Sequence, residues 1–144
     1  LSRQNLPAMD STQIPYHKGL GRGAYIVKKE ENKPDYTLIA TGSELSLAMD
    51  TAAALKRHGK DVRVVSMPCW ELFEEQTPKY RAQILGGDIG KRVSIEAGIS
   101  QGWHRYIGMD GTAISIETFG LSAPYRQLQE EFGFTVERIL EEIL

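Results

Sequence analysis

The chain has 144 residues, a formal net charge of -2, and 41% hydrophobic and 25% charged residues. This length predicts one domain, and the composition is that of a soluble globular protein rather than a disordered one. The charge gives no electrostatic reason to expect nucleic acid or an anionic membrane as a partner. No apolar run approaches the roughly 20 residues of a membrane-spanning helix, and the single cysteine, Cys69, excludes an internal disulfide.

The N-terminal part of the chain differs in character from the rest. Residues 8–23 are polar and interrupted by proline and glycine, which predicts a linker or a long surface loop. The chain begins with Leu1 and shows no signal-peptide pattern. We therefore expect it to have been cut from a longer protein, a processed mature N-terminus being the alternative. An active site in a cut chain would lack some of its groups.

Residues 36–68 predict the strand–helix–strand unit around which the chain is organised. Residues 36–40 and 61–67 are short apolar strands, and apolar side chains recur at helical spacing between residues 45 and 55. Gly59 follows at a position where helices often end. Two strands joined in this way are parallel, with a right-handed crossover in almost all proteins.

The other elements alternate around this unit. A strand at residues 24–29 precedes it, and the charged turn that joins the two is short enough to predict a hairpin. Strands are expected also at residues 91–95 and 112–117, and helices at 78–85, 103–107, 124–132 and after residue 135. Thr77 and Thr135 are expected to cap the first and the last of these helices. The expected fold is a three-layer α/β/α sandwich with a mixed, mostly parallel five-stranded sheet and one antiparallel edge strand.

Ligands of open α/β sheets bind beyond the carboxyl ends of the strands. The first such end holds Gly42 and Ser43, where a glycine and a helix N-terminus could accept an anion. A single glycine is far from a phosphate-binding motif, and helix capping by Ser43, or by Thr41 with Glu44, explains the same residue types. We adopt the capping interpretation and keep the anion site as its alternative.

The remaining chemistry-bearing residues form no recognisable constellation. Glu96 and Glu117 each follow a strand, but an acid–base pair would require them to lie close together, and binding to loop amides is the simpler interpretation. The three histidines and Cys69 have no metal-ligand spacing. The histidines are His17, His58 and His104. Arg3 could recognise a phosphate, although most arginines are simply solvated.

Several strings taken together suggest a family. They are SRQNLP within residues 1–7, GAYIV at 23–27, LIATGSEL at 38–45, VRVVSMP at 62–68, VSIEAG at 93–98, TFGLSAP at 118–124 and EEFGFTVERI at 130–139. In this order and spacing the chain resembles the C-terminal end of transketolase over its whole length. The resemblance implies that residues 1–23 are the tail of a preceding pyrimidine-binding domain with a linker, and that residues 24–144 are the C-terminal domain.

The resemblance also implies a function for the full enzyme. Transketolases are cytoplasmic homodimers that use thiamine diphosphate and Mg²⁺ or Ca²⁺, and transfer a two-carbon ketol unit between sugar phosphates of the pentose phosphate pathway. The cofactor binds in the preceding domains, so we expect no catalytic, cofactor or metal residue in this chain and no activity of the chain alone. In this family the arginine of the SRQ motif, here Arg3, contacts the substrate phosphate.

Alternatives remain at this point. The chain could be a non-catalytic interaction module or bind a regulatory ligand at the strand ends near Ser43. It could also be the last domain of a deoxyxylulose phosphate synthase or of a 2-oxoacid dehydrogenase β chain, which share this fold, although SRQNLP and FGFTVERI favour transketolase. The expected partners are the remaining transketolase domains, not nucleic acid or a membrane.

Overall fold

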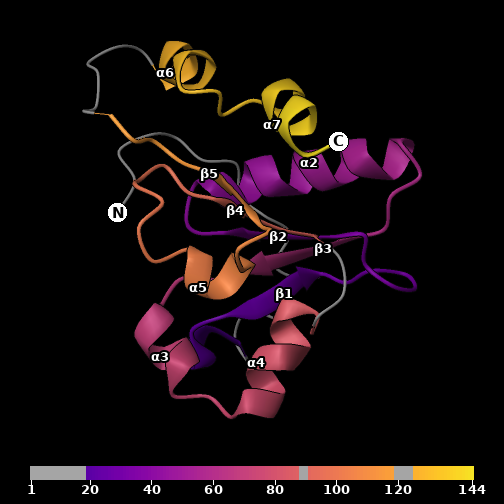
Figure 1. The fold of residues 1–144 in the computed structure, drawn as a ribbon, viewed down its shortest axis with the longest axis vertical. Helices are drawn as coiled ribbons and strands as arrows, with labels where there is room; N and C mark the ends of the chain where they lie inside the picture. The colour runs from indigo at the N-terminus through magenta and orange to yellow at the C-terminus, as the bar shows by residue number, and fades with distance from the viewer. Residues whose placement is uncertain (1–18, 88–90, 119–124) are drawn as a thin grey trace.

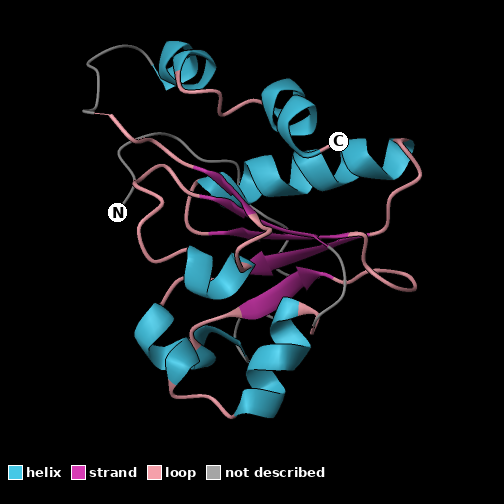
Figure 2. Ribbon diagram, viewed as in Figure 1, coloured by secondary structure: helices cyan, strands magenta, loops and turns pink. Residues whose placement is uncertain are grey.

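The computed structural model describes residues 19–87, 91–118 and 125–144 of the chain. Within these residues, five strands form one sheet with helices on both faces (Figures 1 and 2). The elements in chain order are η1 (Leu20–Arg22), β1 (Tyr25–Lys28), β2 (Tyr36–Ala40), α2 (Glu44–Arg57), β3 (Val62–Ser66), α3 (Trp70–Glu74), α4 (Pro78–Leu85), β4 (Lys91–Ile95), α5 (His104–Ile107), β5 (Thr112–Ile114), α6 (Tyr125–Glu131) and α7 (Val136–Ile143).

The sheet confirms the expected mixed topology. Its strand order is β1-β3-β2-β4-β5. All neighbours are parallel except β1, which lies antiparallel to β3 at one edge. Helices α2, α6 and α7 lie on one side of the sheet, and α3, α4 and α5 on the other (Figure 1). The predicted three-layer architecture with one antiparallel edge strand is therefore confirmed.

The predicted hairpin between the first two strands is wrong. β1 pairs with β3, not with β2. All five residues of β2 are buried, and both of its edges are occupied by the parallel strands β3 and β4. The turn after β1 instead passes the amino end of β3. There the Asp61 carboxylate accepts hydrogen bonds from the backbone amides of Glu31 and Asn32. A short charged turn thus connects strands that are not neighbours.

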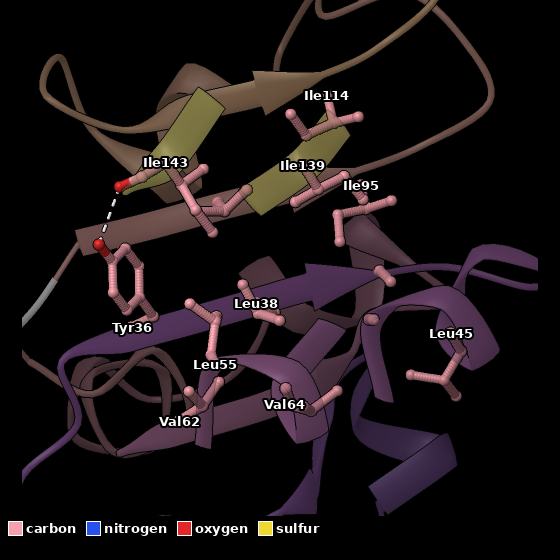
Figure 3. Packing of buried hydrophobic residues seen from close by; sticks show 14 of the residues in the cluster. Tyr36, Leu38, Leu45, Leu55, Val62, Val64, Ile95, Ile114, Ile139 and Ile143 are labelled. Atoms are coloured by element: carbon pink, nitrogen blue, oxygen red, sulfur yellow. Dashed lines mark hydrogen bonds between the residues drawn. The ribbon is translucent and has the colours of Figure 1, made fainter. Parts of the chain in front are cut away.

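The strand–helix–strand unit forms the larger core. Alternate side chains of β2 and β3 point to the α2 face, because successive side chains of a strand alternate between faces. They meet apolar residues of α2 and α7, and the Tyr36 hydroxyl donates to the Ile143 carbonyl at 2.8 Å (Figure 3). This hydrogen bond and the buried Ile139 attach the C-terminal helix to the sheet.

The opposite face has a smaller core that is rich in aromatic side chains. Trp70 and Trp103 make an edge-to-face contact with ring centroids 5.1 Å apart, and Tyr106 lies 5.3 Å from Trp70. Phe73 is fully buried beside Tyr106. Such contacts fix the relative positions of α3 and α5, since aromatic pairs have preferred geometries.

A buried ion pair lies on the same face near the amino ends of the parallel strands. Arg63 of β3 and Glu30 form a two-pronged ion pair, with one N···O distance of 2.7 Å, and their side chains are only 9% and 7% exposed. The Arg63 guanidinium also donates to the carbonyls of Gln83 and Ile84, at the C-terminus of α4. Arg63 therefore ties together the β1–β2 turn, the sheet and α4.

The local signals that delimit helices are largely confirmed. The side chains of Thr77 and Thr135 accept hydrogen bonds from the amides of Tyr80 and Arg138, as capping threonines do. Helix α4 ends at Gly86, which has a left-handed φ of 80°. β5 ends at Ile114 and is shorter than the predicted strand at residues 112–117.

Candidate functional site

The carboxyl edge of the sheet contains a topological switch point. The chain leaves β2 through α2 toward β3 on one side, and leaves β4 through α5 toward β5 on the other. β2 and β4 are neighbours, so the loops after them diverge. In open α/β sheets this is where ligand crevices form. Thr41 directly follows β2 and Glu96 directly follows β4, which places both residues at the switch point.

Carboxylates and hydroxyls form a network there. The Thr41 hydroxyl donates to the Glu96 carboxylate across the two strand ends. The Ser43 hydroxyl donates to the neighbouring Glu44 carboxylate at 2.6 Å. Burial raises the pKa of Glu44, the Ser43 hydrogen bond opposes this shift, and the nearby negative charge of Glu96 adds to it. Two carboxylates, Glu44 and Glu96, therefore lie near each other at the start of α2.

The expected capping by Ser43 or Thr41 is wrong. Ser43 occupies the N-cap position, but its φ of -65° and ψ of -31° are already helical, and its side chain accepts no helix amide. A capping side chain normally needs an extended backbone to reach the following amides. Here the amides of Glu44 and Leu45 donate to the carbonyls of Thr41 and Gly42 instead.

The alternative anion site at Gly42 and Ser43 stays a prediction. Gly42 has a left-handed φ of 48°, and a side chain at this position would meet nothing within 4 Å. The backbone is therefore open to approach. However, the Glu44 carboxylate lies beside Ser43, and this negative charge opposes the binding of an anion.

Glu96 and Glu117 have separate partners. Glu117 accepts hydrogen bonds from the Ser100 amide at 2.8 Å and from the Ser115 hydroxyl at 2.7 Å. Hydrogen bonds from Ser115 and Ser100 lower the pKa of Glu117, as expected for an ionised loop carboxylate. The interpretation of Glu117 as a residue that binds a loop amide is confirmed, and the carboxylate neighbour of Glu96 is Glu44.

A crevice of about 410 Å³ opens beside this network. Its polar lining includes the side chains of Thr41, Cys69, Glu71 and Glu96. Its aromatic wall is formed by Trp70 and Trp103. Sequence reasoning missed Glu71 and both tryptophans. The available signal was their position: Cys69 to Glu71 follow the carboxyl end of β3, and Trp103 precedes α5, which follows β4.

The described residues offer no ligand set for a metal ion. No group of three or more His, Cys, Asp or Glu among them could hold a metal ion. The Cys69 thiol donates to the Glu71 carboxylate at 3.4 Å, and His58 and His104 lie at helix ends. In the part of the chain that the structure describes, no helix is long and apolar enough to cross a membrane.

Two of the residues named from sequence cannot be placed. Arg3 and His17 precede residue 19 and lie outside the described residues. The proposed contact between Arg3 and a substrate phosphate therefore stays a prediction.

Comparison with known proteins identifies the family. Residues 23–135 match the family model of the transketolase-like C-terminal domain. A transketolase of Staphylococcus epidermidis is 45% identical over 143 residues, which are 99% of this chain but 22% of that protein. A transketolase of Streptococcus pyogenes is 47% identical over 141 residues, 98% of this chain and 19% of that protein.

A solved structure agrees with these matches. Pichia stipitis transketolase in complex with sedoheptulose-7-phosphate superposes with a TM-score of 0.86 at 30% identity, covering 97% of this chain and 20% of that one. The chain thus spans about a fifth of the length of the proteins it matches. It belongs to the transketolase family and corresponds to the C-terminal domain.

Proposed function

We propose that the protein to which this domain belongs is a thiamine-diphosphate- and Mg²⁺-dependent transketolase. It transfers a two-carbon ketol unit from a ketose phosphate to an aldose phosphate. The observation that carries this proposal is the 45% identity to a transketolase along 99% of the chain. The complex of the Pichia stipitis relative with sedoheptulose-7-phosphate supports sugar phosphates as the substrate class.

Within that enzyme, this domain contributes to assembly and not to the chemical step. Residues 1–23 belong to the end of the preceding domain and the linker, and the active enzyme is a cytoplasmic homodimer. Exposed leucines on two adjoining elements, Leu20 of η1 and Leu72 of α3, support contact with other parts of the enzyme.

The division of labour is tested by assaying the purified 144-residue chain. A ketose phosphate donor and an aldose phosphate acceptor are supplied with thiamine diphosphate and Mg²⁺, and the longer enzyme serves as the positive control. We expect turnover by the longer enzyme and none by the chain alone. Turnover by the chain would contradict the assembly role, and inactivity of the longer enzyme would contradict the proposed reaction.

Arg3 is the residue that we propose to contact substrate. It would hold the phosphate at the non-reacting end of the sugar, so that remote binding energy orients the carbonyl over the cofactor. In the longer enzyme, Arg3→Ala should raise KM for a phosphorylated donor by about tenfold or more, because a charge-assisted hydrogen bond is lost. KM for a non-phosphorylated ketose should be unchanged, and equal increases for both donors would exclude a phosphate clamp.

A further inference from the structure

Among the described residues, the crevice at the switch point has carboxylates but no cation in its lining. The lining residues include the carboxylates of Glu96 and Glu71 but no lysine, arginine or histidine. Neither carboxylate takes part in an ion pair within the described residues. Their side-chain hydrogen-bond donors are neutral groups, the Thr41 hydroxyl and the Cys69 thiol. A cation entering the crevice would therefore find two acceptors that no charged side chain of the described residues neutralises.

The surroundings of Glu71 favour its ionised form. The pKa of Glu71 is lowered mainly by a hydrogen bond from the backbone amide of Glu71 itself, and further by the hydrogen bond from the Cys69 thiol. These hydrogen bonds keep the exposed Glu71 carboxylate ionised. Glu44 lies close enough to Glu96 for the two charges to interact. Negative charge that persists in a crevice attracts cations and repels phosphates.

The aromatic wall adds a second, independent preference. Trp70 is half-buried and lines the crevice together with Trp103. Trp70 is held by Trp103 and Tyr106, and a side chain on Gly102 would approach it to 2.7 Å, so a glycine allows this close packing. Indole rings attract organic cations through their negative faces, tryptophan most strongly among the aromatic residues. The same wall also accepts an alkyl stem.

We propose that this crevice binds a small organic molecule with a protonated primary amine, with its ammonium group on Glu96 and Glu71 and its carbon stem against the tryptophans. The volume of about 410 Å³ suits a small ligand, since ligand pockets range over roughly 300–1,000 Å³. The site lies outside the proposed sugar-phosphate chemistry, and it is independent of the role of Arg3.

The two tryptophans provide a specific readout. They are the only tryptophans of the chain, and both line the crevice. Butylamine at pH 7.5 should therefore produce a saturable change in tryptophan emission of the 144-residue chain. 1-Butanol, which has the same stem without the charge, and inorganic phosphate should produce none. A linear, non-saturating response to butylamine, or an equal response to 1-butanol, would overturn the proposal.

Charge variants test the assignment to particular carboxylates. Glu96→Gln should weaken butylamine binding by about tenfold, because one charge-assisted contact is lost. Glu71→Gln should also weaken it. Glu75→Gln is the matched control, since Glu75 is exposed just after α3 and does not line the crevice. Unchanged affinity in both Glu96→Gln and Glu71→Gln, with the fold verified by circular dichroism, would overturn the proposal.

A further arm distinguishes the source of the amine. N-acetyl-lysine N-methylamide presents the same ammonium on a polypeptide backbone. We expect it to bind more weakly than butylamine, because its two amide groups enlarge it. Tighter binding of the lysine derivative would assign the crevice to a lysine side chain of a polypeptide and overturn the small-molecule assignment.

Discussion

The carboxylates at the two edges of the sheet have different kinds of partners. At the amino edge, Glu30 is paired with Arg63, and Glu31 with Lys56. At the carboxyl edge, Glu44 and Glu96 have only hydroxyl groups as side-chain partners within the described residues. The buried Arg63–Glu30 pair thus stabilises the fold, whereas Glu96 at the carboxyl edge lines the crevice and remains available to a ligand. This difference locates the candidate site more firmly than any sequence motif did.

The largest expected effect concerns the amino edge. Arg63→Met should lower the free energy of unfolding by about 3–5 kcal/mol, because it leaves Glu30 buried without a partner. The carbonyls of Gln83 and Ile84 also lose their donor. Urea unfolding of the 144-residue chain measures the change.

Lys56→Met is the matched control for this variant. The Lys56–Glu31 pair is solvated, with 60% and 66% of its side chains exposed, so its loss should change stability within experimental error. If Arg63→Met and Lys56→Met lowered the free energy of unfolding by similar amounts, burial would not determine how much each ion pair stabilises the fold.

The aromatic wall of the carboxyl edge should respond to Gly102→Ala. The new methyl group would lie 2.7 Å from Trp70, and Gly102 has a left-handed φ of 89°. We expect a loss of about 1–3 kcal/mol in the free energy of unfolding together with an altered tryptophan emission spectrum. Gly59→Ala, at a φ of 72° but with open space around it, separates backbone strain from the contact. If both variants lost the same free energy of unfolding and kept the tryptophan emission of the parent chain, close packing of residue 102 against Trp70 would be excluded.

A smaller effect of opposite sign is expected at Glu44. Because burial raises its pKa above the ordinary value of 4.5, the folded chain holds this proton more tightly than the unfolded chain. The free energy of unfolding therefore falls as pH rises from 4.5 through the folded-state pKa. Glu44→Gln should be more stable than the parent at pH 7.5, by about 1.4 kcal/mol for each unit of the pKa shift.

The pH dependence of the Glu44→Gln variant supplies its control. Its advantage should vanish below pH 4.5, where the parent carboxyl is protonated in both states. Thermal unfolding at several pH values measures this difference. A Glu44→Gln variant that is less stable than the parent at pH 7.5 would show that the carboxylate has a compensating partner.

The sequence was most informative where structure depends on neighbours along the chain. The strand at Tyr36–Ala40, the helix that follows it, and the threonine caps at Thr77 and Thr135 were predicted because spacing and end signals are local. Strand pairing is not local. A turn of suitable length suggested a hairpin, but burial of β2 between two parallel strands decided the neighbour of β1.

The candidate site shows the same limit. The positions of Thr41 and Glu96 after their strands predicted the edge at which they lie, but not their hydrogen bond. The contact of Trp70 with Trp103 joins elements that follow different strands, and no periodicity signals it. Residue types at strand ends therefore identified the region of the site. Which of its carboxylates have a charged partner could be determined only from the structure.

The most direct test of the difference between the two edges is a carboxyl-carbon NMR titration of Glu30 and Glu44. Hydrogen bonding to Arg63 lowers the pKa of Glu30, and burial raises that of Glu44, from the same ordinary value of 4.5. We predict a midpoint below 4.5 for Glu30 and above 4.5 for Glu44 in the folded chain. Midpoints on the same side of this value, or in reversed order, would contradict the account.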